Sequence, residues 1–153
     1  MSEQPTSTNE PLIIGWREMI ELPDWGIAKI KAKVDTGART SALHVQDLEH
    51  LDDDHVRFNV VVREHPLRLV SVEAPLFRVS RVKPTHDRIE ERPVVQAKMR
   101  LGGVERLIEI SLVGRPGMRC RMLLGRRALA EAFLVDAQHC YVASGRASGK
   151  VKK

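Results

Sequence analysis

Apolar and polar residues alternate along most of the chain, in short stretches separated by turn-forming residues. Residues 27–34 place basic side chains between apolar ones, and 94–101 and 104–113 alternate on either side of Gly102 and Gly103. Such alternation predicts half-buried β-strands, and the glycine pair predicts a hairpin because glycine adopts positive φ without strain. Further strands are expected at 12–16, 17–22, 41–48, 56–63, 67–72, 120–124 and 134–143.

Turn signals separate these strands, and only one segment has a helical pattern. Residues 23–26, with a proline and a glycine, close one pair of strands, and the acidic stretch 51–55 predicts a solvated turn. A short helix is expected at 126–133. Many short strands and a single helix predict a mainly β fold, a closed and mainly antiparallel barrel.

Length and composition fit a single domain. The chain has 153 residues, of which 42% are hydrophobic and only 4% aromatic, so valine, leucine and isoleucine must fill the core. We expect one domain at 12–143, with no internal repeat, between a disordered lead at 1–11 and a basic disordered tail at 144–153. No apolar run approaches the roughly 20 residues that span a bilayer, and the first residues lack a signal-peptide pattern, so a cytoplasmic protein without a membrane partner is expected.

Charge and cysteine content narrow the classes of partner. The net charge of +5 favours acidic partners, although the basic residues are scattered among 20 acidic ones. Cys120 and Cys140 are too few for a disulfide framework, and we expect both to be reduced and buried as small apolar side chains.

One tripeptide stands out as candidate chemistry. The strand at 27–34 stops at Asp35-Thr36-Gly37, which places a carboxylate on a tight loop that Gly37 allows to bend. Acid proteases need a rigidly held aspartate, but Asp and Gly are also common in ordinary turns. A second segment, residues 121–129, supplies two leucines and a glycine that lead directly into the predicted helix.

Together the two segments resemble the retropepsin-like aspartic proteases. In that family an apolar-Asp-Thr-Gly-Ala loop precedes an apolar-apolar-Gly-Arg turn and helix. More narrowly, residues 33–44 are similar to the bacterial family labelled ATP-dependent zinc protease, whose members are typically found beside the ribosomal-protein glutamate ligase. The segments 91–95 and 117–129 are also similar to that family, and the resemblance spans about residues 12–143.

The resemblance implies a catalytic dyad made by two subunits. Since the chain has a single Asp-Thr-Gly, one Asp35 from each subunit of a homodimer would share a proton and activate a water that hydrolyses a peptide bond. Thr36 would hydrogen-bond across the two-fold axis, and the Gly37 amide would donate to the Asp35 carboxylate. The supporting positions are Ala38, Gly125 and Arg126. The family places this arginine under the loop, where its guanidinium can pair with a carboxylate.

The same resemblance suggests how substrate would be held. Residues 79–94 occupy the place of the flexible retropepsin flap but have no glycine at the tip. The neighbouring glutamate ligase suggests peptide or protein substrates with glutamate tails. Such ligands suit the arginines at Arg39, Arg81, Arg88 and Arg92, although those near the flap also fit a solvated strand edge.

No cofactor motif accompanies these segments. There is no His-Glu-x-x-His, no Cys-x-x-Cys and no phosphate-binding loop, so neither zinc nor ATP is expected, although only a short loop separates Asp35 from His44. The main alternative to an aspartic peptidase is a catalytically inactive peptide-binding module of the same fold. A small nucleic-acid-binding barrel is a third hypothesis, and the scarcity of aromatics for base stacking argues against it.

Overall fold

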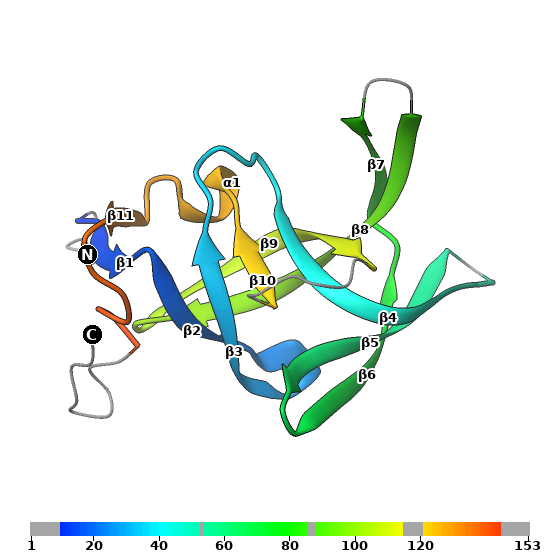
Figure 1. The fold of residues 1–153 in the computed structure, drawn as a ribbon, viewed down its shortest axis with the longest axis horizontal. Coiled ribbons are helices and arrows are strands. Elements are labelled where there is room, and N and C mark those ends of the chain that lie inside the picture. The colour runs from blue at the N-terminus through cyan, green and yellow to red at the C-terminus, as the bar shows by residue number, and fades with distance from the viewer. Residues whose placement is uncertain (1–9, 53, 86–87, 115–120, 145–153) are drawn as a thin grey trace, which may run out of the picture.

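The computed structural model describes residues 10–52, 54–85, 88–114 and 121–144, except for the side chains of 84, 85 and 88. These residues form eleven strands, one turn of 3-10 helix and one α-helix (Figure 1). The strands are β1 Leu12–Gly15, β2 Arg17–Leu22, β3 Ile27–Val34, β4 Ser41–Leu51, β5 His55–Glu64, β6 Leu67–Pro75, β7 Arg78–Thr85, β8 Arg88–Leu101, β9 Val104–Val113, β10 Met122–Leu124 and β11 Phe133–Asp136; the helices are η2 Pro23–Trp25 and α1 Arg126–Leu129.

Six strands close into a barrel, which confirms the predicted fold class. Their order is β10-β3-β2-β8-β9-β4, and β10 also pairs with β4, so the sheet returns to its start. Four of these six pairings are antiparallel, while β10–β3 and β4–β9 are parallel. The predicted hairpin at the glycine pair is the β8–β9 connection, where Gly102 and Gly103 both have positive φ.

Aliphatic side chains fill the barrel, as the composition requires. Ile20, Ile30, Leu43, Met99 and Ile110 are among the fully buried large residues. On β2, β3 and the second half of β8 the buried residues alternate with more exposed ones, as expected of a sheet with one face turned to the core. Strands β5 and β6 extend one side of the sheet, and the β7–β8 hairpin projects from the barrel at the upper right of Figure 1.

The predicted helix at 126–133 is wrong in its second half. Helix α1 ends at Leu129, and Glu131 then adopts a φ of 70°, which breaks the helical path. The chain turns back so that Phe133 pairs in parallel with Leu12, which forms the two-stranded β1–β11 sheet. At four residues, the described helix is too short to cross a membrane.

The predicted terminal strand at 134–143 is also too long, since β11 ends at Asp136. Cys140, expected to be buried, is half-buried with a free thiol. Cys120 lies outside the described residues, as do 1–9 of the predicted lead and 145–153 of the predicted tail.

A buried carboxylate explains why the last described residues leave the strand path. Glu18 on β2 is fully buried, and its Oε2 accepts hydrogen bonds from the amides of Gly15 (2.6 Å), Val142 (2.9 Å) and Ala143 (3.0 Å). Its Oε1 accepts from the amide of Ser144 (2.8 Å) and from that residue's hydroxyl (2.6 Å). Burial alone raises the pKa of this carboxyl, but the hydrogen bonds from Ser144, Gly15 and Ala143 together outweigh it and hold the pKa below its ordinary value of 4.5.

Glu18→Gln should lower the free energy of unfolding by about 2–3 kcal/mol at neutral pH. The substitution removes the charge and turns an NH₂ group toward amide donors. Because the folded-state pKa is depressed, the wild-type contribution is present above pH 4.5 and is lost as the pH falls through the folded-state value. Urea unfolding between pH 3 and 7 measures both effects.

The control for this prediction is Glu49→Gln, an exposed carboxylate whose removal should change stability by less than about 0.5 kcal/mol. A Glu18→Gln variant as stable as the wild type at pH 7 would contradict the anchoring role.

Candidate active site

The Asp-Thr-Gly segment forms the loop that joins β3 to β4 at the top of Figure 1. The amide of Asp35 donates to the carbonyl of Leu124 on β10 (2.9 Å), and the amide of Ala38 donates back to the carbonyl of Asp35 (3.1 Å). Asp35 is half-buried, whereas Thr36 and Gly37 are exposed. The carboxylate therefore stands on a backbone turn anchored to the barrel, with its neighbours open to solvent.

A glycine next to this carboxylate allows the close approach of its backbone to the Asp35 side chain. The amide of Gly37 donates to Oδ1 of Asp35 (3.1 Å), as the resemblance implied. A Cβ at position 37 would lie 3.3 Å from the same oxygen, which is tighter than ordinary contact. Gly37 does not have positive φ, so its role is this close approach and not the sharp bend that the sequence suggested.

The second glycine motif packs directly beneath the loop. A Cβ at Gly125 would lie 2.7 Å from the carbonyl carbon of Thr40 and 3.0 Å from the carbonyl oxygen of Ala38, both backbone atoms. The Gly125 amide donates to the buried hydroxyl of Ser41 (3.1 Å), and the amide of Arg126 donates to the Ala38 carbonyl (2.7 Å). The loop and the turn before α1 are therefore in contact, backbone against backbone.

Arg126 braces the loop, although not through a carboxylate. Its Nη1 donates to the carbonyl oxygens of Thr36 (3.0 Å) and Gly37 (3.1 Å) while the side chain remains exposed. The resemblance implied an arginine–carboxylate pair, but within the described chain the guanidinium bonds to the loop backbone. Two cationic N–H···O bonds hold the turn in its shape.

Sequence reasoning missed two residues that support this site. Ser41, at the start of β4, satisfies the Gly125 amide from a position 84 residues away. Arg106 on β9 donates to the carbonyls of Ala128 (3.0 Å) and Ala130 (2.8 Å) at the end of α1. No local motif marks either residue, because both act through strand register.

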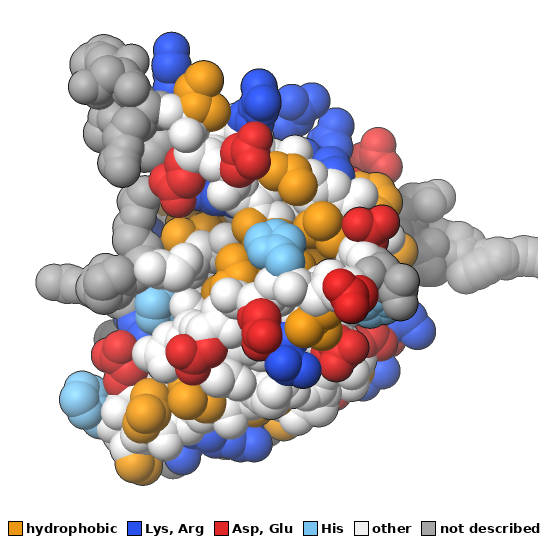
Figure 2. Space-filling model, turned by 90° about the vertical axis from the view of Figure 1, so that its right-hand side faces the viewer, with side chains coloured by type: hydrophobic (Ala, Val, Ile, Leu, Met, Phe, Trp, Pro, Cys, Tyr) orange, Lys and Arg blue, Asp and Glu red, His pale blue; other side chains and the backbone are white. Residues whose placement is uncertain are grey.

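The expected flap region is a hairpin formed by β7 and β8, paired from Arg78↔Val94 to Thr85↔Arg88. In Figure 1 this hairpin and the Asp35 loop project to the same side of the barrel. Large apolar side chains are exposed along it, namely Phe77, Val79 and Ile89. On the face shown in Figure 2, Lys and Arg side chains gather along the upper edge, at the height of the hairpin and the loop in Figure 1.

The four candidate substrate arginines do not form one cluster. Arg39 is exposed on the Asp35 loop, whereas Arg81 and Arg92 lie on the hairpin, where each is 3.5 Å from a glutamate of β8. The side chain of Arg88 lies outside the described residues. The Arg81–Glu91 pair is exposed, so it contributes little stability and can exchange for a ligand carboxylate, whereas the Arg92 side chain is only 18% exposed.

His44, considered as a metal ligand, is buried in the sheet. Its side chain is 4% exposed, and Nδ1 has no hydrogen-bond partner among the described residues. Burial and the positive charge of Arg121 lower the pKa of the imidazole, against smaller opposite effects of Glu64 and a Val113 backbone hydrogen bond. Among the described residues, no three His, Cys, Asp or Glu side chains lie close enough together to hold a metal ion.

A closed six-stranded barrel that presents Asp-Thr-Gly above a Gly-Arg turn is the architecture of the retropepsin-like proteins. Residues 13–145 match the family model RimB-like, described as retropepsin-like aspartic endopeptidase RimB. The chain belongs to this family. The match establishes the retropepsin-like part of the resemblance found in the sequence.

The curated relatives are named as ligases, whereas the family model is described as an endopeptidase. A probable alpha-L-glutamate ligase of Parasynechococcus marenigrum is 35% identical over 132 residues, which are 83% of this chain and 28% of that protein. A protein of the same name from Shewanella halifaxensis is 31% identical over 142 residues, 88% of this chain and 30% of its own length. The chain therefore spans less than a third of these relatives.

A solved structure has the same fold. The Legionella pneumophila protein Lpg0085, of unknown function, superposes with a TM-score of 0.72 at 28% identity. The match covers 88% of this chain and all of that one.

Gly125→Ala should destabilise the fold by about 1–3 kcal/mol, because the added Cβ meets backbone atoms that cannot move without shifting the Asp35 loop. Thermal unfolding measures the effect. The matched control is Gly114→Ala, where the Cβ would lie 3.6 Å from the nearest atom and should have little effect. Equal melting temperatures for the two variants would show that the loop and the turn are not tightly packed.

Proposed function

We propose that this protein is a homodimeric aspartic endopeptidase in which two copies of Asp35 form the catalytic dyad. The observation that carries the proposal is the fixed presentation of Asp35. Its carboxylate accepts the Gly37 amide, its backbone is tied to Leu124, and Arg126 holds the two residues that follow. Membership of a family described as retropepsin-like aspartic endopeptidases supports the same assignment.

The chemistry follows from two carboxylates at close range. Two such groups cannot both ionise cheaply, so the pair retains one proton. The ionised Asp35 takes a proton from a bound water, whose oxygen attacks the carbonyl carbon of the scissile bond, while the protonated Asp35 donates to the carbonyl oxygen. The Asp35 that took the water's proton then donates it to the nitrogen of the tetrahedral intermediate. The other Asp35 takes back a proton from the intermediate's hydroxyl, the carbon–nitrogen bond breaks, and the amine leaves.

A dimer is required because each chain contributes one Asp-Thr-Gly. Thr36 and Gly37 are exposed at the tip of the loop, where a second copy can reach them. The β1–β11 sheet adds an apolar surface, since the paired residues Ile13 and Leu134 are 53% and 56% exposed. We propose that these two neighbouring aliphatic side chains form part of the subunit contact.

Proteins with glutamate tails are the substrates we propose. The supporting observation is that a region similar to this chain occurs in proteins named probable alpha-L-glutamate ligase. The net charge of +5 and the exposed Arg39 and Arg81 suit a ligand rich in carboxylates.

Asp35→Asn should reduce cleavage of a glutamate-tailed protein by at least about 10³-fold, because the amide supplies neither the base nor the shared proton. The Asn side-chain oxygen still accepts the Gly37 amide, so the melting temperature should be unchanged or higher once the crowded carboxylates are gone. Turnover and melting are measured on the same preparation.

Asp52→Asn, at an exposed turn, is the matched control and should retain activity. Cleavage by Asp35→Asn at the wild-type rate would refute the aspartic mechanism. Peptide binding without cleavage by the wild type would favour the inactive binding module in its place.

Sedimentation velocity should show a concentration-dependent dimer at micromolar concentration. Leu134→Glu should shift the equilibrium toward monomer, because it places a charge on the exposed β1–β11 surface. Leu67→Glu, equally exposed but on β6, should leave the dimer intact. A wild-type monomer at every concentration would remove the dyad, since a single Asp35 has no partner to share its proton.

A further inference from the structure

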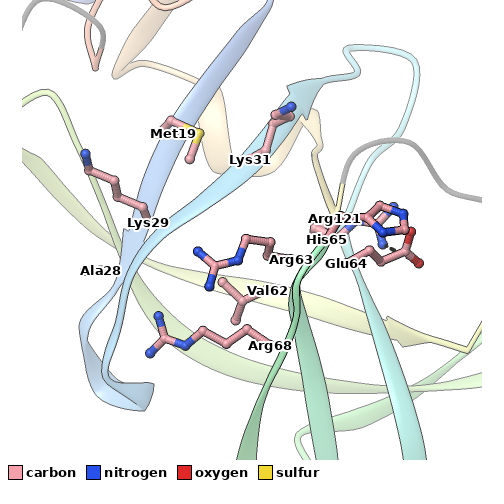
Figure 3. A pocket seen from close by; sticks show the side chains of 10 residues that line it. All are labelled: Met19, Ala28, Lys29, Lys31, Val62, Arg63, Glu64, His65, Arg68 and Arg121. Atoms are coloured by element: carbon pink, nitrogen blue, oxygen red, sulfur yellow. Dashed lines mark ion pairs between the residues drawn. The ribbon is translucent and has the colours of Figure 1, made fainter. Parts of the chain in front are cut away.

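A cavity of about 630 Å³ lies between the outer faces of β2 and β3 and the turn that joins β5 to β6. Five of the side chains around it are cations, Lys29, Lys31, Arg63, Arg68 and Arg121, and we call this cavity the basic pocket (Figure 3). The volume is within the usual range of ligand sites. Among the described residues that line it, Glu64 is the only one with a carboxylate.

Most of this positive charge has no partner in the described part of the chain. Glu64 Oε2 lies 3.2 Å from Nη1 of the buried Arg121, and Arg63 donates to the carbonyl of Pro66 (3.1 Å). No ion pair with a described carboxylate is formed by the other three cations, Lys29, Lys31 and Arg68. One acid facing five cations leaves a site of net positive charge, which favours an anionic ligand.

The basic pocket is continuous with the strand that carries the candidate catalytic residue. On β3, Lys29, Lys31 and Lys33 are all exposed, and their alternation leads directly to Asp35 at the end of the strand. A strand rises about 3.3 Å per residue, so Lys31 is about 13 Å from Asp35 along β3 and the lysines recur about every 6.6 Å. An extended peptide presents side chains on one side at the same repeat.

The lining favours an acidic peptide over a nucleic acid. None of the described side chains that line the pocket is Phe, Tyr or Trp, and the imidazole of His65 is the one ring among them, so the lining offers little surface for base stacking. Arginine and lysine at separate points along an extended track match a row of carboxylates.

We propose that the basic pocket is a second binding site, which holds glutamate side chains of an acidic peptide several residues away from the bond positioned at Asp35. This inference rests on the proposed function and extends it, because it assigns part of the substrate's affinity to residues outside the Asp35 loop. The lysines of β3 would connect the two sites.

The test is binding of fluorescein-labelled hexaglutamate to the Asp35→Asn protein, followed by anisotropy, so that the result does not depend on turnover. The double variants Arg63→Gln/Arg68→Gln and Lys29→Gln/Lys31→Gln, each made in that background, should bind at least about tenfold more weakly. The β3 pair is included because Arg63 also bonds to its own turn.

Arg57→Gln/Lys98→Gln is the control, since it removes the same charge from exposed positions outside the pocket and should change affinity by less than about twofold. If the control and the pocket variants lost the same affinity for hexaglutamate, the loss would be explained by net charge alone and the proposal would be overturned. Unchanged binding in both pocket variants would overturn it as well. Tighter binding of a labelled oligothymidylate, lost in the same variants, would assign the pocket to nucleic acid instead.

Discussion

Closure of the barrel by β10 is the constraint on which the rest of the structure depends. This strand of three residues pairs in parallel with β3 and antiparallel with β4, and so joins the two ends of the sheet. The same strand supplies the Leu124 carbonyl to the Asp35 amide and leads into Gly125 beneath the loop. Closure of the barrel therefore also fixes the candidate catalytic loop through backbone contacts, to which the Arg126 side chain adds two hydrogen bonds.

The two ends of the described chain are held by a different device, a single buried charge. Glu18 is 126 residues from Ser144, yet its carboxylate binds both the hydroxyl and the amide of that residue. A buried charge is tolerated only when its hydrogen bonds are satisfied, and here five donors surround it. This network places the final turns beside β1 and β2, next to the sheet that we propose as a dimer contact.

An acidic substrate would account for two separate features of the molecule, the exposed lysines of β3 and the basic pocket. The chain has relatives named probable alpha-L-glutamate ligase. Exposed lysines follow β3, and further cations line the basic pocket. Carboxylate-rich ligands are weak partners for an uncharged cleft, because their desolvation is costly. A track of exposed lysines and arginines contacts such a ligand while both remain largely hydrated, which favours capture of a flexible acidic tail.

The sequence by itself determined most of the strands, the barrel class and the position of the Asp-Thr-Gly loop. Alternation reports the burial of each strand's own side chains, so β3 and β9 were predicted at the ends they have in the structure. The last residue of β8 was also predicted, but the strand begins at Arg88, six residues before the predicted start at 94. Only the tertiary structure decided where the helix and the last strand end. The chain turns at Glu131 so that β11 can pair with β1, and Glu18 binds the residues that follow β11. The sequence did not predict the basic pocket either, because Arg63 and Arg68 lie near the lysines of β3 only when the β5–β6 turn folds against the barrel. The local sequence pattern indicates which side chains are buried. It does not indicate which charged side chains meet in the folded protein, because that depends on how distant strands pair.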